Sequence, residues 1–291
     1  MGAPALPPGQ VLSYARRVTD RVRGCLGRRL RAAYLHGSAV LGGWVPDRSD
    51  VDMLFVAEDG ARGPDVDALA SVLAASAPEG PGRGLECSVV TVGQASRPQP
   101  PWPFLLHVAH DRADVPQPGD TRELGGALGP GGAFGPGSAQ VRVVRGDGHP
   151  GDPDLLMHYA VCRAAGWATC GPGPRDLIGS VPRPAILGYL ADELGWGLEH
   201  GTEAYAVLNA CRARVFLADG QIVSKIAGGS IALDRGLGPP AALRRALQQQ
   251  QGMAPTQVTG QDAVGYVRAT AAVLRSAADA AAGSAGEAAS P

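Results

Sequence analysis

The first 180 residues alternate short apolar runs with amphipathic stretches, a pattern typical of a sheet covered by helices. Residues 9–30 place apolar side chains at helical spacing with arginines between them, which predicts an amphipathic helix. Further helices are expected at residues 65–76 and 151–166, the latter with Asp152 as its N-cap and Pro153 in its first turn. Strands are predicted at residues 31–36, 51–57, 85–92, 104–110 and 167–172. The last of these is expected at the edge of the sheet.

From about Pro182 the apolar positions follow helical spacing, which predicts a helix bundle. Helices are expected at residues 183–200, 202–219, 240–251 and 262–282. The four glutamines at 248–251 are interpreted as the solvated end of one of these helices. The predicted fold class is α+β, with a mixed-sheet domain followed by an all-α domain. The predicted divisions of the chain are residues 1–180, residues 181–283 and a flexible tail at 284–291.

Residues 124–137 read LGGALGPGGAFGPG, and glycine and proline at this density exclude a regular element. Two interpretations of this stretch stay open, a flexible lid and a disordered loop.

Composition and charge restrict the class of protein. Hydrophobic residues make up 45% of the 291 residues, which is ordinary for a globular chain of one or two domains. A formal net charge of −1 without a basic stripe argues against a general nucleic-acid binder. No signal-peptide pattern begins the chain, and no apolar run approaches the roughly 20 residues of a membrane span. We therefore expect a cytoplasmic monomer without a membrane partner. The five cysteines form no CxxC pair, which argues against a disulfide framework or a zinc site.

The segment SDVDMLFV places Asp50 and Asp52 at the mouth of the strand predicted at 51–57. Side chains alternate faces along a strand, so both carboxylates point the same way, a few ångströms apart. Adjacent carboxylates repel each other unless a cation lies between them, and hard carboxylate oxygens favour Mg²⁺. The pair predicts a magnesium site completed by phosphate oxygens and water.

A phosphate-binding turn is predicted just before this pair, at Gly37 and Ser38. They follow the strand at 31–36 and lead toward a short helix, whose free N–H groups and dipole favour a phosphate. The glycine allows close approach, and the serine hydroxyl adds a donor. Glu86 lies in the otherwise apolar strand at 85–92, either as a third metal ligand or as a general base for an acceptor hydroxyl. Together these features predict a nucleotide–metal site.

The segment GSAVLGGWVPDRSDVD at residues 37–52 resembles the signature of the polymerase-β-like nucleotidyltransferase superfamily. More narrowly, the chain resembles the streptomycin/spectinomycin adenylyltransferases, from about Tyr34 to at least Leu233. The resemblance implies an N-terminal nucleotidyltransferase domain followed by a helical domain. It also implies that the family's catalytic glutamate falls at Glu86, in the segment LECSVV.

The helical half carries the second part of the resemblance. Its segment AYAVLNACRARVFLADGQIVSKIAGG is similar to a family pattern whose arginine and lysine reach the nucleotide phosphates. These fall at Arg212 and at Lys225, the single lysine of the chain. The resemblance implies that ATP binds with Mg²⁺ on Asp50 and Asp52, and that Ser38 helps to hold its phosphates. An antibiotic hydroxyl, deprotonated by the catalytic glutamate, would attack the α-phosphate, release pyrophosphate and leave an inactive AMP ester, which confers antibiotic resistance.

The residues that contact the antibiotic are less sharply defined by the resemblance. The family often has an acidic residue just before the arginine helix, where Thr202 stands with Glu203 beside it. Trp102 is a candidate, by residue type, for the tryptophan that some members stack on streptomycin. A cationic drug requires an acidic cleft, for which the candidate carboxylates are Glu86, Asp192, Glu193, Glu199 and Glu203.

Two other functions are compatible with the same motifs. One is nucleotidyl transfer to a hydroxyl of a different small molecule, a protein or an RNA. The other is a non-catalytic module that binds a nucleotide. The presence of all three carboxylates favours an enzyme.

Overall fold

The computed structural model describes residues 6–111 and 140–287. A six-stranded sheet, in the order β5-β4-β3-β2-β1-β6, forms the centre of the first half. The pair β2 and β3 is parallel, and the other neighbouring pairs are antiparallel. The strands are β1 (Leu30–Leu35), β2 (Val51–Ala57), β3 (Leu85–Thr91), β4 (Leu106–Asp111), β5 (Gln140–Arg145) and β6 (Trp167–Cys170).

This sheet confirms the predicted α+β class, and β6 lies at the sheet edge as expected. Strand β5, at the opposite edge, was not predicted from the sequence. Its residues QVRVVR mix three valines with polar and charged side chains and none of the six is buried, which gives only a weak apolar signal. The glycine-rich stretch at 124–137 lies outside the described residues, so the question of a lid stays open.

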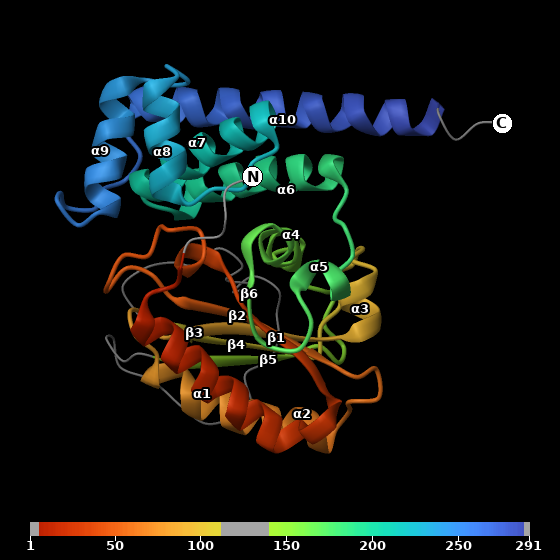
Figure 1. The fold of residues 1–291 in the computed structure, drawn as a ribbon. Helices are drawn as coiled ribbons and strands as arrows, with labels where there is room; N and C mark the ends of the chain where they lie inside the picture. Colours follow the sequence, from red (N-terminus) through yellow and green to blue (C-terminus); the bar gives the residue numbers. More distant parts are fainter. Residues whose placement is uncertain (1–5, 112–139, 288–291) are drawn as a thin grey trace.

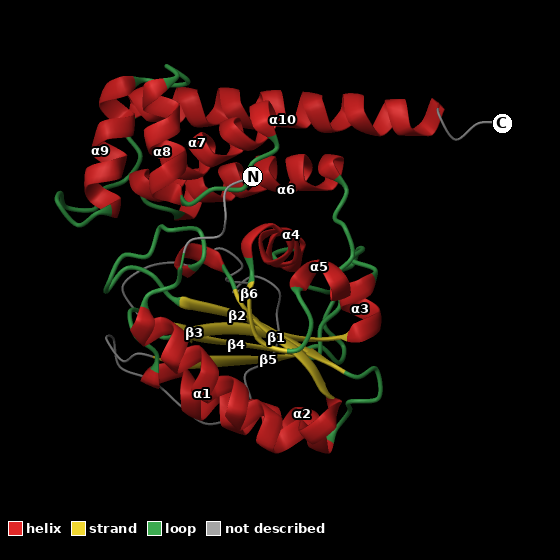
Figure 2. Cartoon of the chain, in the orientation of Figure 1, coloured by secondary structure: helices red, strands yellow, loops and turns green. Residues whose placement is uncertain are grey.

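Helices cover both faces of the sheet, as Figures 1 and 2 show. Helices α1 (Gly9–Leu26) and α2 (Pro64–Ser76) pack on one face. Helix α4 (Leu155–Ala165) lies between the other face and the helical half, next to the short helices α3 (Val92–Ser96) and α5 (Pro174–Leu177). The sheet therefore separates two apolar cores, and the second core continues into the helical half.

The alternation of side chains along β2 decides which face carries the chemistry. Met53 and Phe55 belong to the core beneath α1 and α2, whereas Leu54 and Val56 belong to the core on the other face. Asp52 has the parity of Leu54, because successive side chains point to opposite faces. The carboxylates at the start of β2 therefore face the helical half.

The helical half consists of five helices in the described part of the chain, one more than the sequence pattern predicted. They are α6 (Arg183–His200), α7 (Glu203–Asp219), α8 (Lys225–Asp234), α9 (Pro240–Gln250) and α10 (Gln261–Glu287). Helix α8 was not predicted, since Gly228 and Gly229 lower its helix propensity. Helix α10 packs along α6 and extends beyond it (Figure 1), and it continues into the segment expected as a tail from residue 284. The domain boundaries proposed from the sequence stay a prediction.

Two helix ends differ from the prediction for local reasons. Helix α1 ends at Leu26 rather than at residue 30, because Gly27 has a positive φ of 57° and starts a 3-10 turn. The prediction of Asp152 as the N-cap of α4 was wrong. The carboxylate of Asp152 accepts a hydrogen bond from the Asp154 N–H at 3.0 Å, which forms a turn before the helix, and Asp154 is the N-cap residue.

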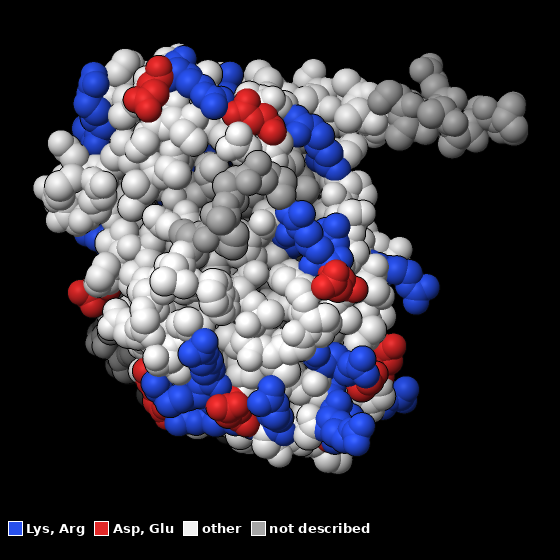
Figure 3. Space-filling view, in the orientation of Figure 1, with Lys and Arg blue, Asp and Glu red and all other residues white. Residues whose placement is uncertain are grey.

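None of the described helices is both long and apolar enough to cross a membrane. On the face of the molecule drawn in Figure 3, basic and acidic side chains are interspersed. Several arginines around α1 are paired with carboxylates, as in the contacts Arg21–Glu79 at 2.9 Å and Arg31–Glu58 at 2.8 Å. The cytoplasmic location stays a prediction.

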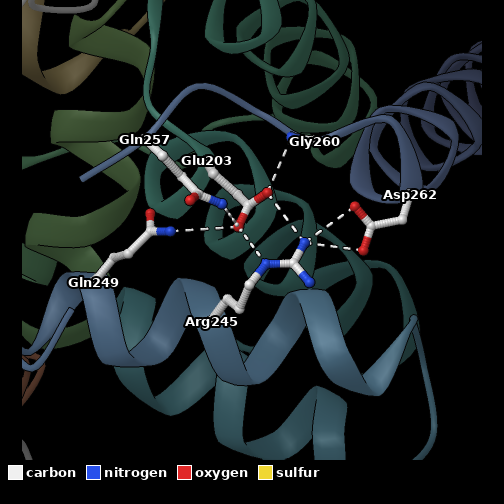
Figure 4. Close-up of polar contacts among 6 residues, drawn as sticks. All are labelled: Glu203, Arg245, Gln249, Gln257, Gly260 and Asp262. Atoms are coloured by element: carbon white, nitrogen blue, oxygen red, sulfur yellow. Dashed lines mark hydrogen bonds and ion pairs between the residues drawn. The ribbon is translucent and has the colours of Figure 1, made fainter. Parts of the chain in front are cut away.

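A buried carboxylate ties α7 to the last two helices (Figure 4). Glu203, in the first turn of α7, is completely buried and accepts hydrogen bonds from Arg245 at 3.0 Å and from the Gly260 N–H at 3.0 Å. Gln249 and Gln257 also donate to this carboxylate, and Asp262 completes the network through Arg245. The interpretation of residues 248–251 as a solvated helix end was therefore wrong for Gln249, which is 2% exposed.

This network predicts a pH-dependent contribution to stability. Burial by itself would raise the pKa of Glu203, but the hydrogen bonds from Arg245 and Gly260 outweigh it and hold the pKa below its usual value. A group whose pKa is lowered by folding stabilises the fold fully above its unfolded pKa, about 4.3 for glutamate, and loses that effect as the pH falls through the folded value.

We expect Glu203→Ala to lower the free energy of unfolding at neutral pH by about 3–5 kcal/mol, because it leaves buried donors and the Arg245 charge without their acceptor. Denaturant unfolding followed by circular dichroism measures this loss, which should shrink in acid as the parent carboxylate is protonated. Glu199→Ala, at an exposed position of α6, is the matched control and should cost less than about 0.5 kcal/mol. Equal losses in the two variants would contradict the role given to Glu203.

Candidate active site

Three carboxylates converge where β2 and β3 begin. Asp52 is the register partner of Glu86 in this parallel pair, and Asp50 lies two residues before Asp52 on the same side. Oxygen atoms of Asp50, Asp52 and Glu86 all lie within 4.8 Å of one another, and all three residues are half-buried. The structure thus brings together the three acidic residues that the sequence indicated.

The turn after β1 closes over this group of carboxylates. Gly37 has a φ of 64°, and a Cβ atom there would overlap the carboxylate of Asp52. The backbone on either side is anchored to the same residue, since the His36 N–H donates to the Asp52 carbonyl at 2.9 Å and the Ser38 N–H donates to the Asp52 carboxylate. Only glycine permits this conformation and this close approach together.

The turn predicted at Gly37 and Ser38, here called the phosphate turn, is present but shorter than expected, and its binding of phosphate stays a prediction. Residues Gly37–Ala39 form a single 3-10 turn rather than a helix, so free N–H groups are available without a long helix behind them. The buried hydroxyl of Ser38 has no hydrogen-bond partner within the described part of the chain. A buried hydroxyl without a partner is costly, and a ligand oxygen at this position would satisfy it.

A cavity of about 250 Å³ lies between these groups and the helical half. One wall contains the carboxylates, Gly37 and Ser38, and the opposite wall is formed by α6, α7 and the start of α8. Arg212 and Lys225, the two cations that the family resemblance indicated, line this opposite wall. The two sets of predicted site residues, far apart in the chain, therefore face a common space.

Close packing of the backbone fixes the positions of the two cationic residues, Arg212 and Lys225. A Cβ atom on Gly228 would lie 2.8 Å from the Arg212 Cγ, so the glycine lets α8 pack directly on α7. A Cβ atom on Gly43 would overlap the side chain of Ser224, which is the N-cap of α8 and accepts a hydrogen bond from the Ala227 N–H at 3.2 Å. The loop after the phosphate turn thus abuts the residue before Lys225.

The charges in this cavity perturb one another. Burial, and then the neighbouring Asp50, raises the pKa of Asp52, and the same causes raise the pKa of Glu86. Burial, and then Arg212, lowers the pKa of Lys225 to about 8, although Asp50 acts in the opposite direction. The part of these shifts that comes from repulsion between the carboxylates is one that a bound cation would offset. Three oxygen donors within mutual reach fit Mg²⁺.

The structure adds site residues that the sequence did not indicate. Tyr205 and Asn209 lie two turns and one turn before Arg212 on the face of α7 that lines the cavity. Their spacing from Arg212, seven and three residues, is a signal that a helical projection of this segment would have shown. The Lys225 ammonium lies 4.4 Å from the centre of the Tyr205 ring, a cation–π contact, and the Tyr205 hydroxyl donates to Glu193.

The predicted acidic cleft is only partly present. Glu86 and Glu193 line the cavity, whereas Asp192 is exposed beside Arg275, at 3.3 Å, and Glu199 is exposed. Glu203 is a correction, because its carboxylate belongs to the buried network of Figure 4. The hydroxyl of Thr202 caps α7 by accepting from the Tyr205 N–H at 3.3 Å. Trp102 lines a different, neighbouring cavity.

Two comparisons with known proteins relate to this arrangement. Residues 177–276 match the family model described as the aminoglycoside adenylyltransferase C-terminal domain. The structure is similar to the crystal structure of a spectinomycin adenyltransferase from Enterococcus faecialis with ATP and spectinomycin, with a TM-score of 0.57 and 16% sequence identity. The similarity covers 92% of this chain and 98% of that chain, and at this identity it shows a common fold. No functionally curated protein was found to match the sequence.

We expect Gly37→Ala to weaken nucleotide binding at least tenfold, because the added Cβ must displace the Asp52 carboxylate. Gly236→Ala is the matched control, since Gly236 has the same φ of 64° but no neighbouring atom within 4 Å of the place that a Cβ would take. Both variants carry the backbone strain of a left-handed alanine, about 1–2 kcal/mol. Isothermal titration with ATP and Mg²⁺ compares the two, and equal affinities would show that close approach at Gly37 is not required.

Proposed function

We propose that this chain is a nucleotidyltransferase of the aminoglycoside adenylyltransferase family, and that it transfers AMP from ATP to a hydroxyl of streptomycin or spectinomycin. One observation carries this proposal. Three carboxylates on one wall of a cavity face Arg212 and Lys225 on the other, which is the charge distribution that a metal-bound triphosphate requires. Such a modification inactivates the antibiotic.

Binding of the nucleotide is assigned to both halves of the chain. Asp50, Asp52 and Glu86 would hold Mg²⁺, which would neutralise charge on the triphosphate and act as a Lewis acid at the phosphoryl oxygens. The Gly37 turn and the Ser38 hydroxyl supply donors for phosphate oxygens. From the helical half, Arg212 and Lys225 supply positive charge to the same phosphates.

In the transfer step, Glu86 accepts the proton of the acceptor hydroxyl. The oxygen forms a bond to the α-phosphorus as the bond from that phosphorus to the bridging oxygen breaks, and pyrophosphate leaves. Glu86 has to be ionised to accept this proton, and bound Mg²⁺ would favour the ionised form by offsetting the burial and the repulsion from Asp50 that raise its pKa. Positioning of the two substrates and neutralisation of the developing charge supply most of the remaining rate.

The test is release of pyrophosphate by the purified protein with ATP and Mg²⁺, which should require streptomycin or spectinomycin. Glu86→Gln should lower turnover by about 10²–10⁴-fold, the usual contribution of a general base, while ATP still binds. Glu199→Gln should leave both quantities unchanged. Mass spectrometry of the product should show the antibiotic with one added AMP. Activity only with another hydroxyl compound would reject the antibiotic as acceptor, and full activity of Glu86→Gln would reject the base.

A second prediction concerns the charge of Lys225. Below a pKa of about 8 the lysine is protonated and attracts the phosphates, so ATP affinity should fall as the pH rises through this value. Lys225→Arg should remove that pH dependence, because arginine keeps its charge, and Lys225→Ala should weaken ATP binding at every pH with the fold intact. Titrations from about pH 6.5 to about pH 9.5, on either side of this pKa, measure the effect. A parallel fall in the parent and in Lys225→Arg would assign it to another group.

A further inference from the structure

The Lys225 ammonium rests on an aromatic ring. It lies 4.4 Å from the centre of the Tyr205 ring, and among the described residues it forms no ion pair with a carboxylate. Asp50 and Glu193 act on it electrostatically from a greater distance. Lys225 is also the first residue of α8, where the partial positive charge of the helix N-terminus disfavours a cation. The electron-rich face of Tyr205 offsets part of this cost.

The position of the Tyr205 ring is set by α6. A Cβ atom on Gly197 would lie 3.1 Å from the ring Cδ1, and one on Gly201, directly after the helix, would lie 2.9 Å from the same atom. Trp196 meets the ring in a T-shaped contact, with 5.7 Å between the ring centres. Glu193 accepts the hydrogen bond of the Tyr205 hydroxyl. The ring therefore lies against one helix along its length, at a place where two glycines leave room for it.

Arg212 is also held by an uncharged partner. Its Nη1 donates to the Asn209 Oδ1 at 3.1 Å, and within the described part of the chain it forms no ion pair with a carboxylate. Tyr205, Asn209 and Arg212 lie on one face of α7 and line the same cavity. A carboxylate partner would compete with phosphate for each cation, whereas a ring or an amide oxygen fixes the cation and leaves its charge available.

We propose that Tyr205 is a positioning residue for Lys225, and that it holds the lysine toward the phosphates of the nucleotide without neutralising it. The assignment rests on the proposed function, since it takes Lys225 as a phosphate-binding residue. Three helices contribute, because α6 supports the ring, α7 carries it and α8 presents the lysine. Tyr205 therefore acts on ATP through Lys225, and its hydroxyl serves to fix the ring.

The contact can be observed directly, because Lys225 is the single lysine of the chain. Nucleotide-free protein labelled with ¹³C-lysine should give one set of lysine side-chain NMR signals. The ring current of Tyr205 should shift the protons next to the ammonium upfield of their position in the unfolded chain. This shift should be lost in Tyr205→Leu and kept in Tyr205→Phe, which retains the ring. An unshifted signal in the parent protein would overturn the proposal, whether or not the variants fold.

Tyr266→Leu is the matched control for these variants. Arg214 lies over the Tyr266 ring, 5.9 Å from its centre, and the Tyr266 hydroxyl also donates a hydrogen bond, to Cys211. Tyr266 is not among the residues that line the cavity. Its replacement should leave the Lys225 signal and the ATP affinity as they are in the parent.

A double-mutant cycle on ATP affinity tests the positioning role. With Mg²⁺ present, Tyr205→Leu should weaken ATP binding about fivefold to thirtyfold, the range that cation–π energies at a desolvated site imply, and Tyr205→Phe should restore most of the affinity. In the Lys225→Ala background Tyr205→Leu should have no further effect, because the ring acts through the lysine. An equal loss in both backgrounds would overturn the assignment, since Tyr205 would then act on the nucleotide itself.

Failure of this assignment differs from failure of the proposed function. A parent protein that binds no ATP would reject the proposed function together with the phosphate-binding role of Lys225, whatever the lysine signal shows. A parent protein that binds ATP, with equal affinity in Tyr205→Leu, would reject the positioning role alone.

Discussion

The candidate active site depends on a balance of charge across the contact between the two halves of the chain. Asp50, Asp52 and Glu86 repel one another in a half-buried position, and burial alone makes each ionised carboxylate costly. Arg212 and Lys225 approach them from the helical half and offset part of that repulsion. The pKa values of Asp52 and Glu86 remain raised and that of Lys225 is lowered, so each side of the cavity is incomplete without a ligand that carries both signs of charge. A metal-bound triphosphate has this property.

Such a balance requires short distances, and glycines provide them. Gly37 brings the phosphate turn against Asp52, Gly43 brings the following loop against Ser224, and Gly228 brings α8 against Arg212. At each position a Cβ atom would lie too close to its neighbour. In the segments at residues 37–52 and 225–229, the glycines are therefore as important for the site as the charged residues. Backbone contact at the glycines sets how closely the two charged walls of the cavity approach each other.

The same face of the sheet carries a row of register partners that crosses β2, β3, β4 and β5. The row that begins with Asp52 and Glu86 ends with Arg142, so the sheet carries negative charge at its centre and positive charge near its edge. Glu86 lines both the cavity between the two halves and the second cavity, the one lined by Trp102. Asp154 links this junction to α6 through Tyr189, so a movement between the halves would alter both cavities together.

Local pattern was sufficient for the features that depend on neighbouring residues in the chain. The apolar runs and the parity that puts Asp50 and Asp52 on one face followed from the sequence alone, because strand and helix periodicity act over a few residues. Arg212 and Lys225 were indicated by the resemblance to a known family and not by periodicity. Tertiary structure decided which charges share a space. It placed Glu193 in the cavity and Glu203 in a buried network, although both had the same appearance in the sequence, because burial and hydrogen-bond partners depend on helices distant in the chain. Strand β5, the burial of Gln249 and the second cavity were decided in the same way, by packing between segments that no local pattern relates.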